Sequence, residues 1–319
     1  MITDSEPWWT PEAPPGLAAF LDVGPLPAPV LPVIAGVLAV AYGAGVVSVK
    51  ASGRPWLVRR SMSFLVGCVI LAATTGLALE AYGTRLFSVF MFQQLTLMIL
   101  VPPLLVLGAP GTLMMRAVPH RGLGRLILRA AHGMLKSRVA RVALHPALGL
   151  ALFILAFYGL YFSGLADVLL RTIGGHVALE VAFLAFGILF AIPVLSPDPL
   201  PIRTTHSGRI LDVFAEMALH AFFGVILMVS IVPLVPAFAS PPTAWDVDPL
   251  ADQQWAGGLA WSYGEAPTVL ILVYLVHRWY RDDTRRAARA DRTADQSGNP
   301  ELAQYNQYLE QLRTRGGAD

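Results

Sequence analysis

Seven long apolar stretches divide this chain, and they constrain its fold more than any other feature. They cover about residues 30–49, 61–79, 86–108, 142–163, 173–195, 211–234 and 255–277. Each is long enough for an α-helix to cross a hydrocarbon core of about 30 Å. Hydrophobic residues make up 55% of the chain and charged residues only 14%, which fits no ordinary soluble class. We therefore predict an all-α, polytopic integral membrane protein with seven transmembrane helices.

The basic residues are concentrated in every second connection between the apolar stretches. Of the 23 lysines and arginines, 21 lie after the first, third and fifth stretches or in the C-terminal tail. The segment before the first stretch carries four acidic residues and no base. Because cytoplasmic loops collect Lys and Arg, the sequence predicts an N-terminus outside and a C-terminus in the cytoplasm. Termini on opposite sides require an odd number of spans, and seven satisfies this.

This topology divides the chain into three parts. Residues 1–29 form an external segment, residues 30–280 the transmembrane domain and residues 281–319 a cytoplasmic tail. In the tail, Asn299, Pro300 and Glu301 have the pattern of a helix start. A short amphipathic helix near 300–313 is predicted there, because apolar residues follow at helical spacing. They are Leu302, Tyr305, Leu309 and Leu312.

The third connection, residues 119–141, has two interpretations. Arg121, Arg125 and Arg129 recur at four-residue spacing, with apolar residues elsewhere around the helix. This pattern is typical of an amphipathic helix on the inner leaflet that contacts anionic lipids. The alternative is an ordinary basic loop on the cytoplasmic side. The basic loops are explained by the membrane, so we predict no nucleic-acid partner.

Function in such a chain depends on the few polar groups inside the spans, because ionisable side chains in hydrocarbon are costly. His176 and Glu180 lie four residues apart in the fifth span, and Glu216 and His220 lie four apart in the sixth. That spacing places both members of a pair on one helix face. Further polar candidates are Gln94 in the third span, Glu265 in the seventh and Asp252 just before it.

These residues allow metal binding, but each also has a plainer interpretation. Imidazole is a common metal ligand, and a nearby carboxylate can ligate the metal or orient the ring. Met217 and Met228 add thioethers of the kind that favours Cu(I). A His–Glu pair can equally be a hydrogen-bonded clasp, and a methionine in a span is usually packing material. The single cysteine excludes a metal site built on a Cys pair.

Several segments resemble one known family. The run Leu100-Val-Pro-Pro-Leu-Leu-Val-Leu-Gly-Ala-Pro110 is similar to the end of the third span in CtaG-type cytochrome c oxidase assembly factors, the polytopic kind associated with caa-type oxidases. Similar segments also occur around residues 175–180, 194–199 and 219–225. The best match is Asp252-Gln-Gln-Trp-Ala-Gly-Gly258. The resemblance covers about residues 30–290, and that family has seven spans with the N-terminus outside.

The resemblance implies a factor that matures a haem–copper oxidase by delivering copper at the outer side of the membrane. Copper would be held by His176, Glu180, His220, Met217 and Met228. The family usually has histidines where this chain has Phe90, Gln94 and Val181. On straight-helix geometry, His176 and His220 differ in depth by about 15 Å, so one ion would reach both only if the helices tilt or slide.

Three functions remain open from the sequence. The first is a copper-handling assembly factor that associates with oxidase subunits or a respiratory supercomplex in the bacterial plasma membrane. The second is a scaffold or accessory subunit that binds no metal. The third is an ion or proton transporter that uses Glu216, His220 and Glu265, although the chain has no internal repeat of the kind common in transporters. We predict no enzyme activity, because no nucleophile–base pair, phosphate loop or dinucleotide fingerprint is present.

Overall fold

A computed structural model describes residues 9–25, 28–119, 121–198, 200, 202, 205–297 and 300–316. Every regular element in these ranges is a helix, as the sequence predicts. The chain divides into two units, Met1–Leu270 and Ile271–Asp319. Of the predicted external segment 1–29, residues 1–8 and 26–27 lie outside the described ranges, as does Asn299.

Within the described ranges, six helices are long and apolar enough to cross a membrane. They are α2 (Val30–Ala51), α3 (Val58–Gly76), the run Phe87–Ala117, α13 (Ile173–Leu195), α14 (His206–Val229) and the run Pro249–Arg292. The predicted fourth span corresponds to a shorter apolar helix, Pro146–Phe162, which is about 25 Å long at 1.5 Å per residue. The chain is therefore a multi-pass membrane protein. The seventh span and the orientation of the termini stay predictions.

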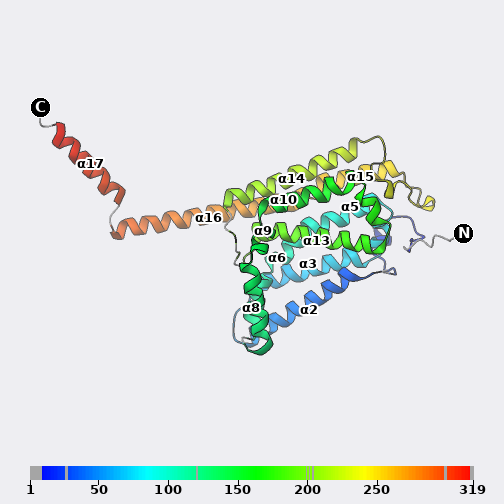
Figure 1. Cartoon of the computed structure of the whole chain (residues 1–319), viewed down its shortest axis with the longest axis horizontal. Helices are drawn as coiled ribbons and strands as arrows, with labels where there is room; N and C mark the ends of the chain where they lie inside the picture. Colours follow the sequence, from blue (N-terminus) through cyan, green and yellow to red (C-terminus); the bar gives the residue numbers. More distant parts are fainter. Residues whose placement is uncertain are drawn as a thin grey trace. The chain divides into compact units, whose positions relative to one another are not determined.

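The long helices of the first unit lie side by side in a bundle (Figure 1). Four short elements form the run Phe87–Ala117: α5 (Phe87–Leu95), the π-helix η1 (Thr96–Leu100), α6 (Val101–Leu107) and α7 (Pro110–Ala117). This run packs against α3, α13 and α15 (Pro249–Ser262). Helix α14 packs along α15, and α10 (Pro146–Ile154) packs against α13 and α14. The run Phe87–Ala117 is therefore central in the bundle.

The π-helix η1 marks the point where the third span is locally interrupted. Pro102 and Pro103 have no N–H to bond the carbonyls of Met98 and Ile99, so the regular helical ladder cannot continue there. Helix α13 approaches closely at this point through Gly187. A Cβ on Gly187 would collide with the Met98 carbonyl oxygen and would lie 2.6 Å from Pro102 Cγ. Helix α13 thus packs directly over the interruption, and only a glycine at position 187 allows so close an approach.

Short elements cover one end of the bundle. These are α1 (Leu17–Phe20), α4 (Leu79–Gly83), α12 (Leu165–Leu170) and the 3₁₀ turns η3 (Pro236–Phe238) and η4 (Thr243–Trp245). The Tyr82 hydroxyl donates to the Ala13 carbonyl at 2.8 Å, and Trp245 Nε1 donates to the Pro11 carbonyl at 3.0 Å. The segment that precedes the first span is therefore tied onto α4 and η4.

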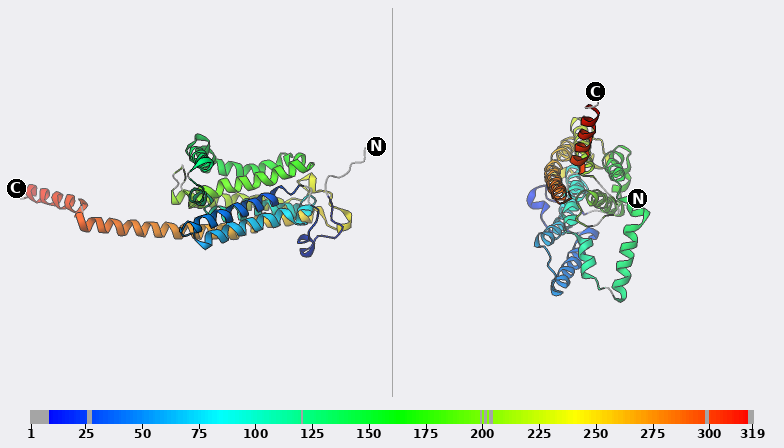
Figure 2. Two further views of the ribbon diagram at one scale, coloured as in Figure 1. Left: turned by 90° about the horizontal axis from the view of Figure 1, so that it is seen from below. Right: turned by 90° about the vertical axis from the view of Figure 1, so that its left-hand side faces the viewer.

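At the opposite end, α8 (Gly122–Lys136) runs crosswise to the bundle helices (Figures 1 and 2). It follows α7 and leads through α9 (Arg138–Ala143) and α10 to the π-helix η2 (Leu155–Gly159) and α11 (Leu160–Phe162). The helix predicted from the spacing of Arg121, Arg125 and Arg129 is present over this stretch.

The second unit contains the end of α16 (Glu265–Ser297) and all of α17 (Pro300–Gly316). Helix α17 covers the tail segment in which an amphipathic helix near 300–313 is predicted. Four large side chains on it are exposed: Tyr305, Tyr308, Leu309 and Leu312.

Candidate functional site

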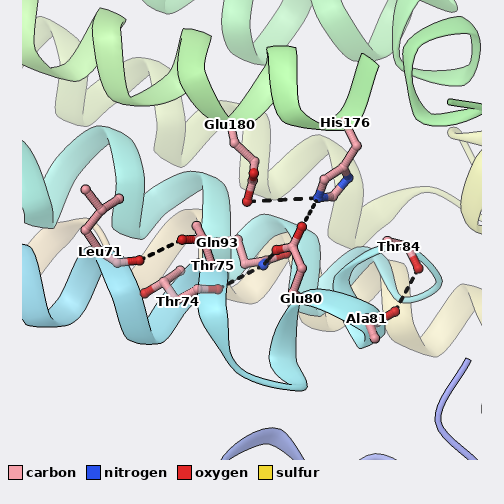
Figure 3. Close-up of polar contacts among 9 residues, drawn as sticks. All are labelled: Leu71, Thr74, Thr75, Glu80, Ala81, Thr84, Gln93, His176 and Glu180. Atoms are coloured by element: carbon pink, nitrogen blue, oxygen red, sulfur yellow. Dashed lines mark hydrogen bonds and ion pairs between the residues drawn. The ribbon is translucent and has the colours of Figure 1, made fainter. Parts of the chain in front are cut away.

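Three ionisable side chains meet at the end of the bundle where α4 lies: Glu80, His176 and Glu180. His176 Nε2 is 2.8 Å from Glu80 Oε1 and 4.0 Å from Glu180 Oε1 (Figure 3). All three residues are buried, with exposures of 7%, 0% and 4% respectively. One ligand atom from each lies within 4.8 Å of the other two, and no other such group of three acidic, histidine or cysteine residues occurs within the described part of the chain.

Helix α13 aims His176 and Glu180 at α4. Thr172 begins the helix, because its Oγ1 accepts a hydrogen bond from Gly175 N at 3.0 Å. His176 and Glu180 then lie one turn apart on the same face. Gly175 has no room for a side chain, since a Cβ there would collide with the Leu169 carbonyl. The close contact with α12 therefore fixes the start of α13 and the position of His176.

Gln93 orients the Glu80 carboxylate. Its Nε2 donates to Glu80 Oε2 at 2.7 Å and to the Thr74 carbonyl at 3.0 Å. A Cβ on Gly83 would collide with Gln93 Oε1, so the α4 backbone presses on the Gln93 amide from the other side. Outer groups of this kind hold a ligating side chain in one orientation.

Phe90 forms an aromatic wall beside the cluster. Its ring centroid is 5.7 Å from that of His176, and the side chain is 1% exposed. Phenylalanine cannot ligate a metal, so this neighbour contributes only apolar surface. Val181, another position where the resemblance implies histidine, is 41% exposed on α13.

Gln94 lies on a different face of α5 and bridges to the fourth apolar helix. Its Oε1 accepts a hydrogen bond from the Tyr161 hydroxyl, and its Nε2 donates to the Ala156 carbonyl at 3.2 Å. The same Nε2 is 3.8 Å from Met98 Sδ. Gln94 thus joins two spans through a satisfied hydrogen-bond network.

His220 belongs to a second location, further along the bundle. Its Nδ1 is 3.0 Å from the Glu216 carbonyl oxygen, which accepts the imidazole N–H. Nε2 faces Gly264, where a Cβ would lie 2.7 Å from this nitrogen and 3.1 Å from Ile99 Cδ1. Ile99 lies nine residues beyond Phe90, the neighbour of His176, which is about 13 Å along a helix. The structure therefore does not bring the two histidines together, and the Glu216–His220 pair is bonded through the Glu216 main chain.

The remaining predicted residues also lie outside the cluster. Met217 and Met228 are half-buried on α14, and Met228 packs against Gly257, where a Cβ would lie 2.8 Å from its Cγ. Glu265 is half-buried at the first position of α16.

Asp252 has a structural role as the cap of α5. Its carboxylate accepts hydrogen bonds from Phe87 N at 2.6 Å, from Ser88 N at 3.3 Å and from the Ser88 hydroxyl. Next to it, Gln253 accepts from Leu234 N at 2.6 Å and donates to the Val232 carbonyl at 3.1 Å. This pair therefore joins α15 to α5 and to the segment after α14.

We expect Asp252→Ala to lower the free energy of unfolding by about 2 kcal/mol, because the buried N–H groups that begin α5 lose their acceptor. The measurement is thermal unfolding in detergent with a thiol-reactive dye, which reports unfolding through the single, buried cysteine Cys68. Gln254→Ala is the matched control, since Gln254 is the exposed neighbour. Equal midpoints for the two variants would contradict the capping role.

Glu80 is the site residue that sequence reasoning missed. It lies one residue beyond the predicted second span, 61–79, so a search of the spans for polar groups does not include it. One feature of the sequence points to this residue: Glu80 is the only charged residue between Arg60 and Arg85. Whether such an acid faces the bundle or the water depends on α4, whose path the sequence does not reveal.

The fold and the cluster together define a multi-pass helical membrane protein with a buried imidazole–carboxylate group at one end of its bundle. Comparison with known families identifies it more closely. The chain belongs to the cytochrome c oxidase caa3 assembly factor (Caa3_CtaG) family, whose sequence profile matches residues 40–282.

Relatives come from mycobacteria. The chain is 39% identical over 280 residues to an uncharacterized protein of Mycobacterium bovis and to one of Mycobacterium tuberculosis, and 36% identical to one of Mycobacterium leprae. The matched region covers 86% of this chain but 42% of each relative, so the chain spans less than half the length of these proteins. No solved structure matched.

The family-like segments contact one another in the fold. Asp198, from the segment 194–199, accepts hydrogen bonds from Gly111 N and Thr112 N, both at 2.9 Å, and so caps α7 directly after the segment 100–110. Gly224 and Gly257, from two further such segments, lie against each other where α14 crosses α15. Much of the resemblance therefore comes from contacts that assemble the bundle.

Proposed function

We propose that this chain is an assembly factor for a haem–copper cytochrome c oxidase in the bacterial plasma membrane, and that it holds copper as cargo between Glu80, His176 and Glu180. The observation that carries the proposal is the cluster itself, three buried ligand-bearing groups within 4.8 Å of one another. Membership of the assembly-factor family supports the link to the oxidase.

The donor set favours Cu(II) over Cu(I). One imidazole nitrogen and two carboxylate oxygens are borderline and hard donors, whereas Cu(I) prefers thiolate and thioether sulfur. Cu(II) is also the tightest-binding divalent ion of the first transition row for such a site. Met217 and Met228, the soft donors predicted from sequence, are not needed for this site.

A bound cation would balance the charge of the cluster when its carboxylates are ionised. If both carboxylates are ionised, their charge exceeds that of the imidazole even when the ring is protonated. A buried charge without compensation is strongly destabilising. A divalent cation between the three groups would offset this charge, with both carboxylates as its ligands.

Delivery at the outer face follows from the predicted topology. With seven spans and the N-terminus outside, the cluster lies toward the outer side, because α4 and the described residues before the first span share one end of the bundle (Figure 2). Copper would then pass by ligand exchange to an oxidase subunit docked against the spans.

The test is copper retention by the purified protein. After loading with Cu(II) and desalting, we expect about one copper per chain, with loss in His176→Ala and retention in His220→Ala. Circular dichroism checks that each variant is folded. Retention by His176→Ala would exclude this site, and no copper in a folded wild-type protein would favour the scaffold function. Exclusive retention of Zn(II) from a mixed solution would refute copper as the cargo.

The scaffold function has one observation in its favour. Two of the three positions where the family usually has histidine carry side chains with other roles: Phe90 packs on His176, and Gln94 bonds Tyr161 and Ala156. The transporter alternative has less support, because His220 Nδ1 bonds the Glu216 main chain rather than its carboxylate, and Nε2 faces Gly264.

A further inference from the structure

The crosswise helix α8 has three distinct sides. Leu128 is buried, whereas Leu126, Ile127 and Met134 are exposed at 67%, 44% and 74%. Arg125 and Arg129 are exposed on a third side. At 100° per residue, Ile127 and Met134 lie on the side of the helix opposite Arg125 and Arg129. A helix with this distribution lies at the surface of a bilayer, with its apolar side toward the acyl chains.

A crevice of about 360 Å³ lies between α8 and the bundle. Residues of α2, α3, α6, α7, α8 and α13 line it, and most of them are apolar, including Leu38, Met115, Ala131, Leu135 and Ile188. This volume is within the usual range of about 300–1,000 Å³ for a ligand site.

Among the described residues, two ionisable side chains line the crevice, and they differ in the hydrogen bonds that they can offer a ligand. The Asp198 carboxylate is already hydrogen-bonded within the protein, because its oxygens accept from Gly111 N and Thr112 N at the start of α7. His132 is exposed at the edge, with Nδ1 2.8 Å from the Leu128 carbonyl oxygen. Its other ring nitrogen is therefore left for an external partner.

His132 connects the crevice to the basic side of α8. Arg125, Arg129 and His132 are spaced by four and three residues, so they form one stripe along the helix. At 100° per residue, Leu135 of the crevice lies about 60° from His132 and so is next to this stripe. An apolar slot thus opens directly beside a row of cationic and hydrogen-bonding groups, which suits a ligand with an acyl chain and an anionic headgroup.

We propose that this crevice binds one anionic glycerophospholipid. One acyl chain fills the slot between α7, α8 and α13, and the headgroup phosphate contacts Arg125, Arg129 and His132. The guanidinium groups favour a phosphate that carries net negative charge over one paired with choline. The site is separate from the Glu80 cluster, so it does not depend on the function proposed above.

The acyl-chain slot is tested by placing a larger side chain in it. The protein is reconstituted in bilayers of equal parts phosphatidylglycerol and phosphatidylcholine and extracted in mild detergent, and the retained lipid is quantified by mass spectrometry. We expect wild-type protein to retain phosphatidylglycerol selectively. Ala131→Phe should lower this retention at least about tenfold, because the ring displaces methylenes of the acyl chain. The matched control is Ala130→Phe, on the exposed side of the same helix, which should retain it. Equal loss in both variants, or equal retention of the two lipids by wild type, would overturn the proposal.

The headgroup contact is tested without changing the slot. Arg125→Gln with Arg129→Gln should reduce phosphatidylglycerol retention about tenfold and leave the fold intact, because both side chains are exposed. Arg281→Gln with Arg285→Gln is the matched control, since it removes two exposed arginines at the same spacing from α16. Equal retention by the two double variants would show that the α8 arginines do not hold the lipid.

Discussion

Replacing Glu80 by glutamine is expected to abolish copper retention without weakening the fold. Glu80 supplies the carboxylate oxygen 2.8 Å from His176 Nε2, and a neutral amide is a much poorer ligand. We expect affinity to fall by more than about a hundredfold, beyond the 10–100-fold typical of losing an outer-shell partner. Glutamine can still accept the hydrogen bond from Gln93, so the local packing is preserved.

The same substitution should leave the metal-free protein at least as stable as wild type. Glu80→Gln removes one of two carboxylates buried beside a single imidazole, and uncompensated buried charge is destabilising. Copper content by elemental analysis should therefore fall, whereas the unfolding midpoint of the metal-free protein should not. Glu216→Gln is the control, because it neutralises another buried carboxylate outside the cluster. Copper loss in both variants, or a large drop in the midpoint for Glu80→Gln, would contradict the assignment.

The helical fold could be predicted because each long apolar stretch has few ways to satisfy its backbone in lipid. The residues at which each helix begins and ends are harder to predict from the sequence. The fourth span was predicted to begin at Val142, but the structure ends α9 at Ala143 and begins α10 at Pro146. Proline lacks an N–H and fits the first helical turn, where the His145 side chain accepts from Ala147 N at 3.2 Å. The helix that results is therefore shorter than predicted.

The site could be predicted only where a local pattern carried it. His176 and Glu180 share a helix face because of their spacing, and the structure does place them together. Glu80 joins them through the path of α4, which depends on contacts far away in sequence, such as Tyr82 with Ala13. The sequence indicates Asp252 only as a polar residue just before the seventh span. Its role as the cap of α5 requires contact between Ser88 and Asp252, which are 164 residues apart. Tertiary contacts of this kind leave no periodic signal.

The glycines of the family-like segments illustrate the same limit. Gly257 and Gly258 are neighbours in the sequence and equally apolar, yet the structure gives them opposite surroundings. A Cβ on Gly257 would lie 2.6 Å from the Gly224 carbonyl oxygen and 2.9 Å from Leu227 Cβ. A Cβ on Gly258 would meet nothing within 4 Å. The sequence alone cannot say which of the two lets α15 approach α14.

We accordingly expect Gly257→Leu to prevent the bundle from assembling and Gly258→Leu to be tolerated. At Gly257 the obstructing atoms include backbone, which cannot move aside without separating α14 from α15, so the cost is about 3 kcal/mol or more. Asp252 and Gln253 lie on the same helix, so separation would also strain the cap of α5 and the segment after α14. The measurement is the yield of monodisperse protein in detergent together with the unfolding midpoint reported by Cys68. Similar yields and midpoints for the two leucine variants would refute the close helix crossing, because the substitution is chemically identical at both positions and differs only in what surrounds it.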